Sequence, residues 1–208
     1  MRGLRAPGWV LAFASLVYFF LHAPLLVLVA FSFNDSKFSA GFEGFTFHWY
    51  ERLLERSDVL EALKMSLIVG LGSTLVSTVL GTLFALGLSR RKFRGRTALE
   101  SLVYIPVVTP EIVVGISLLL LFVTLGVELG LPTILVAHIA FNISFVVVVV
   151  RARLEGMDRS LEEASLILGA DEWTTFWRVT VPQLWPGILS GALLAFIMSF
   201  DDFVITSM

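Results

Sequence analysis

Five long apolar stretches constrain this chain more than any other feature of its sequence. Together they contain one charged residue, Glu111, and they occupy residues 9–33, 65–89, 101–127, 129–150 and 179–200. About 20 apolar residues in an α-helix cross the roughly 30 Å hydrocarbon core of a bilayer, so each stretch is long enough to span a membrane. We therefore predict an all-α, polytopic transmembrane helix bundle, with a single transmembrane domain over residues 1–208.

The composition supports the membrane class and excludes several others. Hydrophobic residues make up 57% of the 208 residues and charged residues 15%, which leaves too little polar chain to cover a soluble core. There is no cysteine, which excludes disulfide scaffolds and Cys-ligated metals, and the net charge of −2 offers no basic field for nucleic acid. We predict no catalytic residues, no cofactor and no metal site.

The distribution of Lys and Arg predicts the orientation. Eleven of them fall on the side of the N-terminus and four on the opposite side. The eleven are Arg2, Arg5, Arg90, Arg91, Lys92, Arg94, Arg96, Arg151, Arg153, Arg159 and Arg178. Since basic residues accumulate in cytoplasmic loops, we expect a cytoplasmic N-terminus. The first stretch could be a signal peptide, but its length and the absence of a small-x-small cleavage site favour an uncleaved span.

Several local patterns refine this prediction. Residues 34–64 mix acids with aromatics and are interpreted as an interfacial hairpin or helix, or else as a docking surface for an outside partner. A small residue at every fourth position of the second span predicts close helix packing; these are Ser73, Ser77, Gly81 and Ala85. Pro106 and Pro110 predict a kinked or interrupted third span, which makes it a candidate pathway helix.

Residues 151–178 form the main polar segment on the predicted cytoplasmic side. Ser160 and Glu163 have the spacing of a capping box, Gly169 suits a helix end, and Asp171 can cap a second helix. We predict two short helices joined by a glycine turn, with apolar side chains that need a groove to fill.

This segment resembles the EAA loop of bacterial ABC importer permeases. Glu163-Ala164-Ser165, three residues, Gly169, nine residues and Val179-Thr180-Val181-Pro182 match the family pattern Glu-Ala-Ala, three residues, Gly, nine residues, Ile-x-Leu-Pro. Ser165, Val179 and Val181 are small or conservative departures. Residues 105–113 and 199–204 also resemble the spermidine/putrescine type of permease, particularly its second subunit.

The resemblance implies a type I ABC importer permease in the bacterial inner membrane. Its expected partners are a second permease subunit in a heterodimer, two ATPase subunits that bind ATP and Mg, an extracytoplasmic substrate-binding protein and membrane lipid. Glu163, Ala164, Ser165, Leu168 and Gly169 are implied to contact the ATPase, although Glu163 could also only cap its own helix. Such permeases have six spans, so we expect that a sixth is missing here.

Three acids are candidates for lining the path of a cation, for which a polyamine would be suitable. At 1.5 Å per residue, Glu111 lies about 16 Å into its span, and Asp201 and Asp202 about 27 Å into theirs. Alternatively, Glu111 pairs with the companion permease, and the two aspartates end the last span. His138 and Asn142 are interpreted as an interhelical hydrogen-bonding pair rather than as a site.

Competing functions remain at this point. The alternatives are an ABC permease for another cation, a metal, thiamine or an anion, an intramembrane enzyme, or a channel. No nucleotide-binding Gly-x-x-x-x-Gly-Lys-Ser/Thr pattern occurs, so hydrolysis must come from a partner. The predicted cytoplasmic hairpin has no role in a channel.

Overall fold

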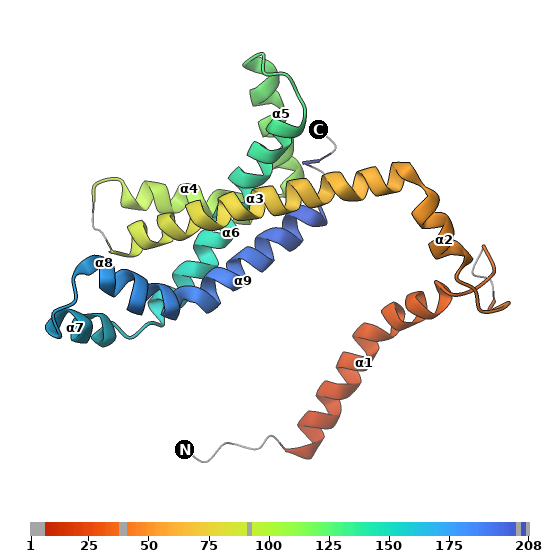
Figure 1. Ribbon diagram of the computed structural model, residues 1–208, viewed down its shortest axis with the longest axis horizontal. Coiled ribbons are helices and arrows are strands. Elements are labelled where there is room, and N and C mark those ends of the chain that lie inside the picture. The colour runs from red at the N-terminus through yellow and green to blue at the C-terminus, as the bar shows by residue number, and fades with distance from the viewer. Residues whose placement is uncertain (1–6, 38–40, 91–92, 203–204, 207–208) are drawn as a thin grey trace. The chain divides into compact units, whose positions relative to one another are not determined.

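All regular secondary structure in the described residues is helical, as predicted. The computed structural model describes residues 7–37, 41–90, 93–202 and 205–206 (Figure 1). The helices are α1 (Gly8–Phe31), α2 (His48–Glu55), α3 (Ser57–Arg90), α4 (Arg96–Val108), α5 (Glu111–Thr124), α6 (Leu131–Glu155), α7 (Ser160–Ile167), α8 (Glu172–Thr175), the π-helix η1 (Phe176–Thr180) and α9 (Val181–Phe200). Four helices among these residues are long and apolar enough to cross a membrane, and the bent pair α4–α5 can count as a fifth span.

Some residues used in the sequence analysis lie outside the described part of the chain. Arg2, Arg5, Arg91 and Lys92 of the charge count are among them. Residues 203–204 of the second resemblance and the C-terminal residue are also among them.

The chain divides into two compact units, residues 1–62 and 63–208. In the first unit, α1 has no buried residue. After α1, Asn34 and Phe45 form an isolated antiparallel bridge, and the Trp49 indole N–H donates to the Asn34 carbonyl at 2.9 Å. Phe33 stacks on Phe45 and also contacts Phe47 and Tyr50. The described residues between α1 and α3 therefore form a small aromatic hairpin followed by the short helix α2.

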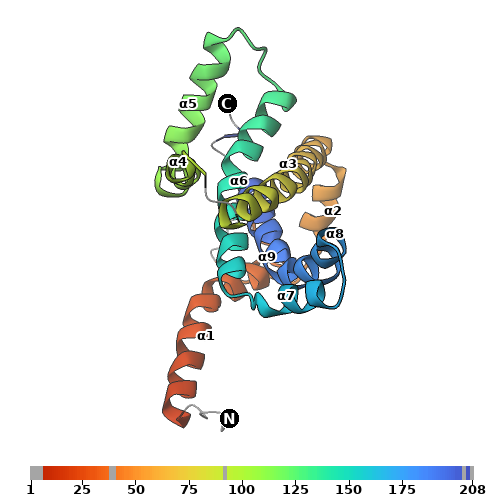
Figure 2. The same ribbon diagram turned by 90° about the vertical axis from the view of Figure 1, so that its left-hand side faces the viewer.

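In the second unit, α3, α6 and α9 pack closely because small residues face their neighbours (Figure 2). All four members of the predicted small-residue stripe on α3 are buried, which confirms its packing role. A methyl group added at Gly81 would lie 2.7 Å from the Val146 side chain of α6, and one at Gly187 of α9 would lie 2.6 Å from Arg153. Val146, Val147 and Val150 fill the core beside these contacts.

The predicted proline interruption is confirmed. Helix α4 ends at Val108, α5 begins at Glu111, and the two axes differ by 113°. Thr109 is extended, with φ −83° and ψ 137°, because the residue before a proline is disfavoured in the helical region. Figure 1 shows α5 leaving this break in a different direction from α4.

The polar segment folds as a helical hairpin, with two corrections to the prediction. Ser160 does not form a capping box, because the Asp158 carboxylate already accepts its backbone N–H at 2.9 Å and the N-cap of α7 is Arg159. The second arm is not a separate helix, since α8, η1 and α9 run continuously from Glu172 to Phe200. The helix of the last span therefore begins seven residues before the predicted 179.

Candidate functional site

The tip of the hairpin presents apolar side chains that nothing in the described chain covers. Ile167 and Leu168 are 85% and 87% exposed, and Trp173 on the second arm is 68% exposed. Gly169 follows them with φ +89°, a left-handed conformation that suits glycine at a helix end. The two arms are joined by the Ser165 and Thr175 hydroxyls, whose oxygens lie 3.0 Å apart.

The predicted coupling residues therefore divide into two groups. Glu163, Ala164, Leu168 and Gly169 are exposed at the hairpin surface, whereas Ser165 is turned toward the other arm. Within the described chain, the Glu163 carboxylate has no hydrogen-bonding partner, so it does not cap its own helix. The surface group can contact another protein, and Ser165 holds the hairpin together.

Sequence reasoning missed the neighbouring Glu162, which ties the hairpin to the rest of the unit. Its carboxylate pairs with the Arg90 guanidinium at the end of α3 and accepts the Thr180 hydroxyl at 2.5 Å. Arg90 also donates to the Thr180 hydroxyl at 3.3 Å. We call Arg90, Glu162 and Thr180 the hairpin triad. The one sequence feature that could have indicated this role is the second glutamate beside the motif.

Two aspartates fix the turns of the hairpin. The Asp171 carboxylate accepts the Thr174 backbone N–H at 3.0 Å, which confirms the predicted cap. Hydrogen bonds from Thr174 lower the pKa of Asp171, and those from Ser160 lower the pKa of Asp158. Both turns are therefore stabilised by the charged form of the carboxylate.

Two of the three predicted pathway acids come together at the break between α4 and α5. The carboxyl groups of Glu111 and Asp202 lie close to one another. Asp202 also lies 3.2 Å from His138 Nε2 of α6, and both side chains are almost completely buried. Asp201 is exposed. The structure thus separates the aspartates, both of which follow the end of α9 at Phe200.

The contact between Glu111 and Asp202 corrects the depths expected from straight spans. Those depths put the two residues about 11 Å apart along the membrane normal. Helix α4 begins at Arg96, five residues before the predicted span, so Glu111 lies farther from the hairpin end than expected. The helix of the last span also begins earlier than predicted, so the start points alone do not bring the two residues together; the packing of α5 and α9 on α6 does.

A chain of buried hydrogen bonds extends from the acids into the helix packing. His138 Nδ1 lies 2.8 Å from the Ser199 hydroxyl, which lies 2.9 Å from the Ser73 hydroxyl of α3. His138 is thus an interhelical hydrogen-bonding residue, as predicted. Asn142 is not its companion, because its buried side-chain amide has no partner among the described residues.

Comparison with known proteins decides the family. Residues 77–208 match the model of the binding-protein-dependent transport system inner membrane component. The chain belongs to this family. It is therefore a multi-pass inner-membrane permease subunit of a binding-protein-dependent transporter.

Individual relatives agree with the family assignment. The chain is 37% identical to the spermidine/putrescine transport system permease PotC of Escherichia coli K12, over 94% of this chain and 74% of the relative. It is 39% identical to the putrescine transport system permease PotI of the same organism, over 98% of this chain and 75% of the relative.

Solved structures show the fold. A bacterial ABC transporter involved in the import of the acidic polysaccharide alginate superposes with a TM-score of 0.67 at 18% identity, over 93% of this chain and 73% of that one. The alginate transporter bound to its pentasaccharide-loaded periplasmic protein gives 0.64 at 19% identity, over 90% and 70%. The predicted type I ABC importer permease fold is therefore correct.

Proposed function

We propose that this permease imports a polyamine of the spermidine or putrescine type, and that its hairpin couples transport to a cytoplasmic ATPase. The observation that carries the coupling is the exposed apolar tip formed by Ile167 and Leu168 beside Gly169. Apolar side chains on a polar hairpin outside the spans gain free energy when a partner's groove covers them. The tip thus fits a cleft of an ATPase subunit.

The assembly follows from this assignment. In this proposal the hairpin side is cytoplasmic, and because four spans precede the hairpin, the N-terminus is expected on the same side. A second permease, two ATPase subunits and an extracytoplasmic binding protein complete the transporter. ATP and Mg bind to the ATPase subunits, and this chain contributes no catalytic residue.

The hairpin triad supplies a route for the movement. A pull on the hairpin tip reaches Glu162, and from there the end of α3 through Arg90 and the π-helix segment η1 through Thr180. The π-helix continues into α9, whose far end carries Asp202. Displacement of the hairpin thereby reorients two spans, one of which ends at the acidic cluster.

Two observations favour a polyamine as the cargo. Relatives that match 94% and 98% of this chain are named for spermidine and putrescine. Glu111 and Asp202 lie together where α5 begins and α9 ends, and Asp201 follows α9 directly. Carboxylates in a membrane protein line paths for cations, and a polyamine carries several ammonium groups. The alginate transporter carries an acidic cargo on the same fold, so the cargo is argued from these residues and not from the fold.

The coupling proposal is tested by a charge at the hairpin tip. Leu168→Asp should preserve membrane insertion, because the side chain is 87% exposed, and should abolish uptake of radiolabelled putrescine and spermidine by cells with the whole assembly. Leu168→Met keeps an apolar tip and should retain uptake. Normal uptake by the Leu168→Asp variant contradicts coupling through this tip, whereas accumulation of a different solute by wild type contradicts only the cargo.

A further inference from the structure

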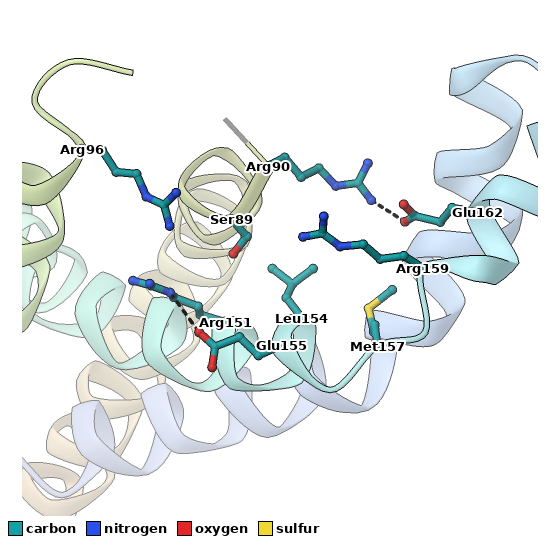
Figure 3. Close-up of a pocket in the computed structure, with 9 residues that line it drawn as sticks. All are labelled: Ser89, Arg90, Arg96, Arg151, Leu154, Glu155, Met157, Arg159 and Glu162. Atoms are coloured by element: carbon teal, nitrogen blue, oxygen red, sulfur yellow. Dashed lines mark hydrogen bonds and ion pairs between the residues drawn. The ribbon is translucent and has the colours of Figure 1, made fainter. Parts of the chain in front are cut away.

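A basic pocket lies at the hairpin end of the second unit, apart from the acidic cluster. Its volume is about 390 Å³, and it is lined from α3, α4, α6 and the start of the hairpin. Four arginines contribute to the lining, namely Arg90, Arg96, Arg151 and Arg159. Figure 3 shows them on several sides of the pocket, with Arg159 reaching toward Ser89 and Arg90.

The pocket has one positive charge more than its carboxylates neutralise. Arg96 and Arg151 share Glu100 at 3.0 and 3.1 Å, and Arg151 also lies 3.4 Å from Glu155. Arg90 pairs with Glu162. The Arg159 guanidinium has no ionic or hydrogen-bonding partner within the described residues, so four arginines face three carboxylates.

A buried hydroxyl without a partner lies in the same pocket. The Ser89 hydroxyl is buried and has no hydrogen-bond partner among the described residues. A buried polar group without a partner costs free energy, so a ligand that accepts a hydrogen bond from it gains affinity. A hydroxyl and a guanidinium are both donors, and together they suit an acceptor that carries about one negative charge.

An apolar groove lies at the same end of α3 and α4. Its volume is about 570 Å³, and it is lined by Leu83, Phe84, Gly87, Leu88, Phe93 and Leu99, with others. No heavy atom lies within 4 Å of a methyl group placed at Gly87, so the groove is open there. The basic pocket and the apolar groove share lining segments. On α3 they are lined by the consecutive residues Ser89 and Leu88, and on α4 by Arg96 and Leu99, one turn apart.

We infer that the basic pocket binds the phosphate of an anionic phospholipid from the bilayer leaflet on the hairpin side, with an acyl chain in the apolar groove. A phosphodiester carries one negative charge, which balances the excess charge of the pocket. Its oxygens accept from Arg159 and Ser89, and basic pockets between membrane helices on the cytoplasmic side are suited to anionic headgroups. Because Arg90 and Glu162 also line the pocket, the bound lipid lies against the hairpin triad.

The test compares lipid selectivity in the intact transporter. The complete assembly is reconstituted in bilayers, and association of spin-labelled phosphatidylglycerol is measured against spin-labelled phosphatidylcholine. We expect a preference for phosphatidylglycerol that falls about fivefold in Arg159→Gln, as the loss of one basic contact near the headgroups predicts. Ser89→Ala keeps every charge and should also lower the preference, because it removes a direct donor to the phosphate.

The matched control is Arg178→Gln, which removes the same charge from an exposed position outside the pocket. It should keep the preference for phosphatidylglycerol. An equal preference in wild type and Arg159→Gln overturns the proposal, as does the absence of any preference in the assembly. The alternative ligand is a free phosphate from solution, and it is tested by adding inorganic phosphate to the assembly in phosphatidylcholine bilayers. The melting temperature of the assembly is measured in phosphatidylcholine bilayers, with either inorganic phosphate or phosphatidylglycerol added. If phosphate raises it as much as phosphatidylglycerol does, the site takes free phosphate and the lipid assignment is wrong.

Discussion

Two adjacent glutamates in the hairpin have opposite roles at the scale of single residues. Glu163 matches the family motif and is exposed, whereas Glu162 is turned inward to Arg90 and Thr180. Neighbouring positions on a helix point about 100° apart, so one side chain can face a partner while the next faces its own chain. The motif identified the outward residue, and only the packing of α3 against the hairpin identified the inward one.

Neutralising these glutamates separately should distinguish their roles. Glu162→Gln should loosen the hairpin and increase hydrogen exchange in residues 160–180 of the assembly, at a cost of about 1 kcal/mol for a partly exposed pair. Glu163→Gln should leave exchange in those residues unchanged when the permease is separated from its ATPase, since the structure gives its carboxylate no contact. Equal exchange in both variants would contradict the assignment of Glu162 to the triad.

At the scale of elements, the hairpin depends on caps and the spans depend on small residues. Asp171 begins the second arm by accepting the Thr174 N–H. Gly81 allows α3 to approach Val146 of α6, and the chain is too crowded there for a methyl group. The first feature is local in sequence and was predicted as such. The second was predicted as a packing stripe, but its partner helix was not.

The Asp171 cap makes the second arm sensitive to acid. Its pKa in the folded protein is lower than the ordinary 3.8, because Thr174 hydrogen-bonds the charged carboxylate. A lowered folded pKa contributes stability that is fully present above the unfolded pKa and is lost as the pH falls below 3.8 through the folded value. Hydrogen exchange of Thr174 and Thr175 should therefore increase in that acid range. In Asp171→Asn the amide oxygen still caps the helix, but this acid dependence should disappear; if it persists, another group is responsible.

Gly81→Ala should destabilise the second unit by about 1–3 kcal/mol, because the added methyl group overlaps the β-branched Val146 side chain. Gly87→Ala in the same helix is the matched control, since its methyl group meets no atom within 4 Å. That variant should be neutral or stabilising, as alanine is favoured over glycine in a helix. Thermal unfolding of the purified assembly measures both, and equal melting temperatures would be evidence against close packing at Gly81.

At the scale of the whole molecule, residues far apart in sequence meet at one level of the bundle. Glu111 follows the proline break, His138 lies within α6, and Asp202 follows α9. They are brought together because α4 ends where α9 ends and α6 passes beside both. The hairpin at the other end of α9 is connected to the same helix, so one span links the exposed apolar tip to the acidic cluster.

Neutralising the acidic cluster should stop transport without dismantling the protein. Glu111→Gln with Asp202→Asn should abolish uptake of labelled putrescine by cells with the whole assembly, because the cluster loses the charge that attracts a cation. The control is Glu128→Gln, an exposed acid between α5 and α6, which should transport normally. Unchanged uptake by the double variant, at equal membrane levels, would exclude these acids from the path.

The sequence alone determined the class, the spans and the location of the hairpin. Apolar length and charge distribution act locally, since every stretch must satisfy its own backbone in a bilayer. The proline pair likewise interrupts a helix through local backbone effects, whatever the tertiary surroundings. These features needed no knowledge of which helices are neighbours.

The tertiary structure decided which residues of different helices contact one another. Four features join residues from different parts of the chain: the contact of Glu111 with Asp202, the link from His138 to Ser73, the hairpin triad and the basic pocket. Helix crossing and tilt place them, and these depend on how small and branched side chains fit across an interface. That fit is a property of pairs of helices, so the pattern within any one span does not contain it.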